Sequence, residues 1–333
     1  MARDEMSARI WSMAGLGTPM AIRTAATLRL ADHIAGGADT AEAIATAEGV
    51  DADALERVMR YLAVRGVLTR EGDGRYSLTP LGAVLREDHP SKARARLDIE
   101  GSVGRAELSF VQLLHSVRTG EAGFPVQFGR SFWEDWAADP ERAANFNRLT
   151  SDLESRSPEI VEGMDWGPLG WVVDVGGGNG ALLIGLLNAY PTLRGTVLEM
   201  PDNCETARKS VAESGMGDRL DVVAGSFFDP LPAGAGGYVL SFVLHNWADD
   251  PAREILRRCA EAAGNTGAVL VVEQTGPGGA ATHTGMDLRM LTACGGRERT
   301  ADDLTALAAS VGLRGVAVHP AGSFSIVELR AAG

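Results

Sequence analysis

A cluster of glycines separates two apolar stretches in residues 171–187, WVVDVGGGNGALLIGLL. The pattern predicts a strand, a tight turn and a helix. Gly176, Gly178 and Gly180 would let the backbone approach a ligand without a clash from Cβ, and the start of the helix would favour an anionic group. Glu199 ends the next predicted strand, where its carboxylate can accept hydrogen bonds from both hydroxyls of a ribose. These residues indicate a nucleoside cofactor, although a tight turn with a solvated glutamate fits the same pattern.

The glycine spacing disfavours a dinucleotide such as NAD. The turn has the pattern GxGxG and lacks the third glycine of the dinucleotide motif GxGxxG. Asp174 stands at the end of the strand, just before the turn, where it could meet a cationic amine. The turn also follows a long and mostly helical region. The residues of the turn alone therefore leave the ligand open.

His245 is the second feature that could carry chemistry. It follows the apolar strand YVLSFVL and precedes NWADD. Open α/β sheets bind ligands at the carboxyl ends of their strands, so a histidine at this place is a candidate general base. A hydrogen-bonded loop histidine is the structural alternative.

Composition limits the class of partner. The chain has 333 residues and a net charge of −13, which disfavours nucleic acid or an anionic membrane as the main partner. The cysteines Cys204, Cys259 and Cys294 have neither metal-ligand nor disulfide spacing. Early acidic residues make the N-terminus a poor signal peptide, and no apolar run reaches the ~18–20 residues of a membrane helix. We therefore expect a cytoplasmic protein without a metal site.

The first 90 residues are predicted to be mostly helical and to end in a β-hairpin. Helices are expected within 23–37, 39–50 and 51–68, with Asp39 or Thr40 as N-cap of the second, and the hairpin within 67–82. Three helices and a hairpin form a winged-helix pattern, which often binds DNA. This region holds ten arginines, no lysine and thirteen acidic residues, so its charge of about −3 disfavours phosphate contacts. A packing or dimerisation module is the favoured interpretation.

Beyond a helical middle region at 91–165, predicted strands alternate with helices from residue 166 onward. The strands are expected at 171–175, 196–200, 220–224, 237–244, 268–273, 313–318 and 324–329. This alternation predicts an α/β fold with a mostly parallel, doubly wound sheet. A short link, PAGS, joins the last two strands, which should therefore pair antiparallel.

Six motifs occur in order between residues 171 and 300: VVDVGGGNG, LEMP, GSFFDPLP, LHNWADD, VVVEQ and GGRERT. Together they resemble the plant-type O-methyltransferases, in the bacterial branch that tailors antibiotics. The resemblance implies a winged-helix dimerisation domain at 1–90, a helical linker and substrate-pocket region at 91–165, and a Rossmann-like, seven-stranded catalytic domain at 166–333. It also implies a homodimer, S-adenosylmethionine as cofactor and S-adenosylhomocysteine as product.

The resemblance also implies which residues bind the cofactor. Gly176 and Gly178 would lie against its methionine and ribose portions, and Glu199 would hold the ribose. The other positions implied are Asp174, Ser226, Phe227, Ser241 and Phe242, with Ser226 and Phe227 beside the adenine. The chain departs from the family at three of these positions, where aspartate, lysine and tryptophan are common in place of Ser226, Ser241 and Phe242.

For the reaction, the resemblance implies His245 as general base, flanked by Glu273 and Glu298. A carboxylate that accepts from an imidazole N–H fixes the tautomer and stabilises the imidazolium. A phenol, with a pKa near ~10, is mostly neutral at pH ~7, so a base must take its proton as the oxygen attacks the methyl carbon. The sulfonium is already a good leaving group, and no metal is required. Asn246 stands where the family commonly has an aspartate.

The acceptor is expected to be a phenolic aromatic compound, such as a polyketide-derived hydroxynaphthoate. By resemblance the helix containing Met286, Asp287 and Met290 walls its pocket, although this spacing also fits a core stripe. Weaker candidates from the middle region are Trp133, Phe146 and Asn147, and Arg9 from a partner chain could meet a carboxylate on the acceptor.

Two other functions fit parts of the sequence. A relative of the same fold could use the cofactor site for altered chemistry, such as hydroxylation. A winged-helix regulator could sense a small molecule through its C-terminal domain, but the acids that begin its third helix, Asp51, Asp53 and Glu56, argue against DNA binding.

Overall fold

The computed structural model describes residues 2–154, 157–275 and 283–333. The chain divides into two compact units, the first comprising Met1–Leu108 and Glu141–Leu149 and the second Ser109–Pro140 and Thr150–Gly333. Part of the middle region therefore belongs to each unit. The boundaries expected near residues 90 and 165 stay predictions.

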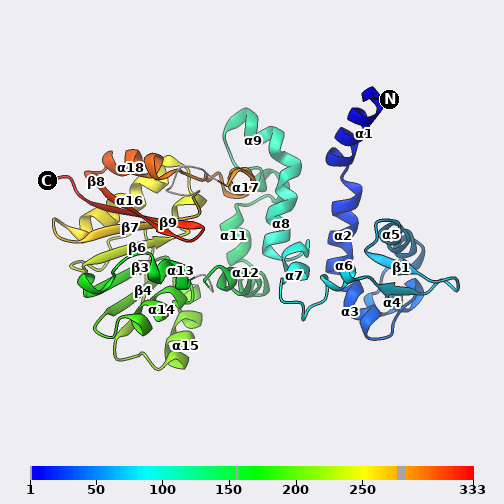
Figure 1. Ribbon diagram of the computed structural model, residues 1–333, viewed down its shortest axis with the longest axis horizontal. Helices are drawn as coiled ribbons and strands as arrows, with labels where there is room; N and C mark the ends of the chain where they lie inside the picture. The colour runs from blue at the N-terminus through cyan, green and yellow to red at the C-terminus, as the bar shows by residue number, and fades with distance from the viewer. Residues whose placement is uncertain (1, 155–156, 276–282) are drawn as a thin grey trace. The chain divides into compact units, whose positions relative to one another are not determined.

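The first unit is helical apart from one small hairpin (Figure 1). Its elements are α1 (Ala2–Ala14), α2 (Gly17–Thr27), α3 (Leu30–Ala35), α4 (Ala41–Glu48), α5 (Ala52–Val64), β1 (Leu68–Arg70), β2 (Tyr76–Leu78), α6 (Pro80–Ala83), α7 (Ala93–Leu97) and α8 (Ser102–Leu108). β1 and β2 pair antiparallel, as the hairpin prediction requires. The side chains of Thr40 and Asp51 cap α4 and α5 by accepting backbone N–H groups.

The helix predicted within 23–37 is interrupted in the structure. Arg29 has a φ of 48°, in the left-handed region, and separates α2 from α3. The spacing of apolar residues continues across this break, because side chains of both helices, such as Ala25 and Leu30, enter the same core. Periodicity alone therefore could not reveal the interruption.

The second unit begins with short helices and continues as an α/β domain. Its elements are η1 (Ser109–Gln112), α9 (Leu113–Thr119), α10 (Phe124–Phe128), α11 (Phe132–Ala137), α13 (Ser157–Glu162), η2 (Gly167–Leu169), β3 (Trp171–Val175), α14 (Ala181–Ala189), β4 (Arg194–Glu199), η3 (Pro201–Asn203), α15 (Cys204–Ser214), β5 (Leu220–Ala224), β6 (Gly237–Ser241), η4 (Leu244–Asn246), α16 (Asp249–Ala263), β7 (Ala268–Glu273), α17 (Thr284–Cys294), α18 (Ala301–Ala309), β8 (Leu313–Ala321) and β9 (Phe324–Ala331). α12 (Pro140–Glu154) has residues in both units.

Seven strands form one sheet in the order β5-β4-β3-β6-β7-β9-β8. The first five are parallel, and β9 pairs antiparallel with both β7 and β8. The predicted seven-stranded α/β fold and its antiparallel final pair are therefore confirmed. Side chains of α13, α14 and α15 pack on one face of the sheet, and those of α16 and α18 on the other, which gives the three layers visible in Figure 1.

β6 is shorter than the predicted strand 237–244. It ends at Ser241, because Phe242 adopts a φ of 56° and the chain then turns into η4. The backbone N–H of Phe242 still donates to the carbonyl oxygen of Val272 on β7 at 3.0 Å. This turn lies at the carboxyl ends of parallel strands, the edge where open α/β sheets bind ligands.

Candidate active site

Glu199 and the glycine turn form one structure at the carboxyl ends of β3 and β4, which we call the cradle (residues 174–180 and Glu199). The Glu199 side chain, buried at 8% exposure, accepts the N–H of Gly178 at 2.9 Å and that of Met200 at 2.7 Å. Gly176, Gly178 and Gly180 all have positive φ angles, of 76°, 58° and 83°. An L side chain at these positions would strain the backbone, so the glycines are needed for the turn itself.

Asp174 lies under the same turn. Its side chain is buried at 2% exposure, at the end of β3. A Cβ on Gly177 would come within 2.6 Å of the Asp174 carboxyl carbon, so the absence of a side chain at Gly177 leaves room for this carboxyl group. Two acids and a backbone turn are thus held together at the edge of the sheet.

The other cofactor candidates lie on the loops after β5 and β6. A Cβ on Gly176 would lie 3.2 Å from Val243 and 3.5 Å from the Phe227 ring, so these two side chains approach the glycine turn. Ser226, Ser241 and Phe242 are all half-buried, and the Phe242 ring packs edge-on against Phe324 at 5.2 Å. The cradle and these loops together combine a ribose-type acceptor, close backbone and an aromatic wall, which fits a nucleoside such as S-adenosylmethionine.

His245 lies in η4, between two carboxylates from distant parts of the chain. Its Nδ1 is 2.9 Å from Glu298 Oε1 and 3.6 Å from Glu273 Oε2, and its backbone N–H donates to Glu273 Oε1 at 3.1 Å. Because an ionised carboxylate can only accept, the Glu298 contact places a proton on Nδ1. Nε2 has no hydrogen-bond partner among the residues that the structure describes. That nitrogen is therefore the one left to take a proton from a substrate.

The electrostatics of this cluster suit a base. Burial lowers the pKa of His245, but the charges of Glu273 and Glu298 and the hydrogen bond to Glu298 outweigh it and raise this pKa above its usual value. Burial, helped by the neighbouring Glu298, raises the pKa of Glu273 to about 7. The raised pKa of His245 brings it nearer to that of a phenol, which makes proton transfer more favourable.

The acceptor candidates of α17 are Met286, Asp287 and Met290, and their surroundings differ. α17 packs against η4. Asp287 accepts the backbone N–H of Glu298 at 2.9 Å, so it holds a member of the cluster. Met286 is half-buried and Met290 is buried at 9% exposure, which fits both a pocket wall and the core stripe.

Trp133 of α11 lies on an aromatic cluster beside η4. Its ring stacks on Trp247 at 6.2 Å and an interplanar angle of 17°. Trp247 in turn meets Phe227 and Phe228 edge-on, at 5.8 Å and 5.1 Å. The cluster therefore connects Phe227, which approaches the glycine turn, to Trp247, two positions after His245. Neither Trp247 nor Phe228 was predicted as a site residue, although they stand in the motifs LHNWADD and GSFFDPLP.

Three acceptor candidates belong to the first unit. Phe146 is half-buried in α12, and Arg9 is exposed on α1, both in the first unit. Asn147 also lies in α12, but its side chain is outside the described residues. Their part in binding the acceptor stays a prediction.

The comparisons with known proteins agree with this geometry. Residues 110–314 match the O-methyltransferase domain family, and residues 12–88 match the O-methyltransferase dimerisation domain. The chain belongs to the O-methyltransferase family.

The chain is 52% identical to a 2,7-dihydroxy-5-methyl-1-naphthoate 7-O-methyltransferase of Streptomyces carzinostaticus, over 96% of both proteins. It is 42% identical to the aclacinomycin 10-hydroxylase of Streptomyces purpurascens, over 98% of this chain and 91% of that protein. A crystal structure of an O-methyltransferase from neocarzinostatin biosynthesis, in complex with S-adenosylmethionine and 2-hydroxy-5-methyl naphthoic acid, is similar with a TM-score of 0.91 and 53% identity, over 96% of this chain and 98% of that one.

This O-methyltransferase therefore uses S-adenosylmethionine as its methyl donor, as the resemblance implied. In the described part of the chain, no group of three or more His, Cys, Asp or Glu side chains could hold a metal ion. The described helices are also too short or too polar to cross a membrane.

Proposed function

We propose that this O-methyltransferase methylates a phenolic hydroxyl of an aromatic polyketide-type acid in antibiotic biosynthesis, with His245 as general base. The observation that carries the proposal is the Nδ1 contact to Glu298 at 2.9 Å, which leaves Nε2 for the substrate. The naphthoate acceptor in the name of the Streptomyces carzinostaticus relative, and the naphthoic acid in the solved complex, support this class of substrate.

When bound, S-adenosylmethionine supplies a methyl group on a sulfonium, which leaves readily. His245 Nε2 takes the phenol proton as the oxygen attacks, while Glu298 and Glu273 stabilise the imidazolium. The aromatic cluster of Trp133, Phe227, Phe228 and Trp247 excludes water, which favours a reaction in which the nucleophile and the sulfonium neutralise each other.

The cradle positions the donor in this proposal. Glu199 accepts the ribose hydroxyls, Gly176 and Gly178 approach the ribose and methionine portions, and Asp174 faces the amine. Ser226, Phe227, Ser241 and Phe242 border the adenine. Met286, Met290 and Trp133 wall the acceptor pocket, with Asp287 behind Glu298, while Phe146, Asn147 and Arg9 are further candidates.

The first unit is proposed to form a homodimer and not to bind nucleic acid. Large apolar side chains of α1 and the turn after it are more than 60% exposed: Met6, Ile10, Trp11, Met13 and Leu16. Such a patch marks a protein interface. In α5, Asp51 serves as the N-cap and Asp53 is exposed, which disfavours contact with phosphates.

The test is His245→Ala, assayed with S-adenosylmethionine and a panel of hydroxylated aryl acids, with products detected by mass. We expect kcat to fall by about 10²–10⁴-fold, because general base catalysis is lost, while the dissociation constant for S-adenosylmethionine is unchanged. His319→Ala is the matched control, since His319 also contacts a glutamate, Glu328, at 3.1 Å but lies on β8, away from the cradle. Equal losses of turnover and cofactor affinity in His245→Ala would refute the base role.

Hydroxylation is the second candidate function, favoured by the 42% identical hydroxylase. The same assay separates the two functions. Methyl transfer adds the mass of one methylene group to the acceptor, whereas hydroxylation adds the mass of one oxygen atom.

A further inference from the structure

Arg299 is a buried cation that the proposed reaction does not use. The residue follows Glu298 in the segment that connects α17 to α18, and its side chain is 3% exposed. A buried guanidinium is costly unless its charge and its donors are matched. Its partners therefore indicate what it does.

The Arg299 guanidinium spans the turn that carries His245. Nη1 donates to the carbonyl oxygen of Leu244 at 2.9 Å, and Nη2 donates to that of Trp247 at 2.9 Å. These carbonyls belong to the residues on either side of the pair His245–Asn246. A planar, rigid fork holds two acceptors at a fixed separation, so Arg299 fixes the shape of η4.

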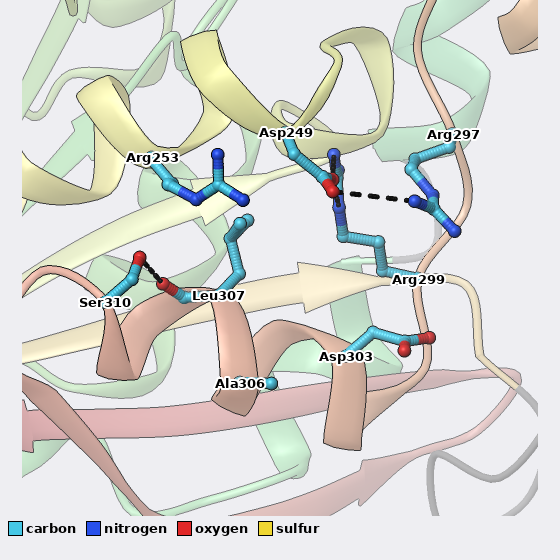
Figure 2. Close-up of a pocket in the computed structure, with 8 residues that line it drawn as sticks. All are labelled: Asp249, Arg253, Arg297, Arg299, Asp303, Ala306, Leu307 and Ser310. Carbon is cyan, nitrogen blue, oxygen red and sulfur yellow. Dashed lines mark hydrogen bonds and ion pairs between the residues drawn. The ribbon is translucent and has the colours of Figure 1, made fainter.

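Asp249 holds the fork in place. Its Oδ1 accepts from Arg299 Nη2 at 2.8 Å and from Nε at 3.2 Å. The Arg299 guanidinium keeps the pKa of Asp249 below its ordinary range, so this partner stays ionised. Figure 2 shows the pair at the edge of a cavity of about 250 Å³, with Arg297 on one side and Arg253 on α16 on the other.

The segment that carries Arg299 also makes backbone contact with His245. The N–H of Arg297 donates to the carbonyl oxygen of His245 at 2.9 Å. A Cβ on Gly296 would overlap that same oxygen, so the segment can approach only with glycine there. Contacts of Gly296, Arg297 and Arg299 thus join the segment that supplies Glu298 to the turn that supplies His245.

We propose that Arg299, held by Asp249, is a positioning residue that sets His245 against Glu298 and so aims Nε2 at the acceptor. This inference rests on the proposed base role of His245. Arg299 touches neither reacting group, and its effect passes through η4. Its charge also lowers the pKa values of His245 and Glu273, the other groups facing the imidazole being Glu298 and, behind it, Asp287.

The test compares Arg299→Lys and Arg299→Gln in kcat, KM for the acceptor, cofactor affinity and the pH profile of kcat. Lysine keeps the charge but cannot bridge two carbonyls in one plane, so kcat should fall by about 10²-fold. The rising limb of the pH profile, on which His245 loses its proton, should stay in place. Glutamine should lower kcat similarly and also move the rising limb to higher pH, because the charge that lowers the pKa of His245 is gone. The affinity for S-adenosylmethionine should not change in either variant.

Arg253→Gln is the matched control, because Arg253 lines the same cavity but pairs with Asp250, and it should behave as the wild type. If Arg299→Gln does not fold, Arg299→Lys and Asp249→Asn decide the question, with thermal unfolding as the check on the fold. Wild-type kcat in the Arg299 variants overturns the positioning role. So does a loss of kcat in proportion to cofactor affinity, if the rising limb of Arg299→Gln has not moved. If His245→Ala keeps its turnover, the proposed function fails instead, whatever the Arg299 variants show.

Discussion

All residues of the cradle lie between positions 174 and 199, whereas His245 and Glu298 are 53 residues apart, with Glu273 between them in the sequence. In the cradle, backbone N–H groups and glycines shape a turn, and Glu199 accepts backbone N–H groups, those of Gly178 in the turn and of Met200 beside it. In the proposed catalytic cluster of His245, Glu273 and Glu298, three ionisable side chains lie together, and the pKa values of His245 and Glu273 respond to their neighbours. Damage to the cradle should therefore appear in cofactor affinity, and damage to the cluster in turnover and pH dependence.

The largest effect that would sharpen this contrast is expected from Glu298→Gln. An amide cannot stabilise the imidazolium as a carboxylate does, so kcat should fall by about 10²-fold with cofactor affinity unchanged. The measurement is kcat at saturating cofactor, together with calorimetric titration of S-adenosylmethionine. Glu328→Gln, which removes a carboxylate from the half-buried pair with His319, should leave both values as they are. A loss of cofactor affinity in Glu298→Gln would break the contrast.

A smaller effect, confined to the cradle, is expected from Gly177→Ala. The added methyl group would lie 2.6 Å from the Asp174 carboxyl carbon and displace it, so the dissociation constant for S-adenosylmethionine should rise by about 10-fold. With the cofactor raised to saturation, kcat should return to the wild-type value. Gly217→Ala is the control, since a Cβ there meets nothing within 4 Å. If kcat stays low at saturating cofactor, the two regions are not separable.

The smallest effect is on stability, where the titration of Glu273 should make the unfolding temperature depend on pH. The pKa of Glu273 is raised to about 7, so the folded protein holds a proton that the unfolded chain has already released. The folded state is therefore favoured at low pH, and this contribution is lost as pH rises from ~4.5 through about 7. Glu273→Gln removes the titration, so its unfolding temperature should fall about 2 °C less than that of the wild type between pH ~5 and ~8. Equal slopes in the two proteins, measured by calorimetry, would contradict a proton held at Glu273.

The sequence was more informative for the cradle than for the cluster, for a physical reason. Strand, turn and helix are neighbours in the chain, so Gly176, Gly178 and Glu199 could be connected by spacing alone. The pairing of Glu273 and Glu298 with His245 depends on sheet order and on a loop that returns from α17. Only the resemblance to a family linked them in advance.

Residues that act through backbone contacts left the weakest signal in the sequence. Gly296 and Arg299 stand in the motif GGRERT and Asp249 in LHNWADD, yet nothing in residue type or spacing showed that a guanidinium spans η4. The early end of β6 was missed for a similar reason. Phe242 continues an apolar strand pattern, and nothing in its residue type predicts a φ of 56°.

Phe242 has a consequence for how this enzyme can be stabilised. A left-handed phenylalanine costs roughly 1–2 kcal/mol of backbone strain, and a glycine at that position would remove it. Glycine would also remove the ring that packs against Phe324, and deleting a core aromatic side chain costs about 3–5 kcal/mol, more than the strain it would relieve. The packing of the ring therefore outweighs the strain of its backbone. Stabilising substitutions in this enzyme are better made at exposed positions far from the sheet edge.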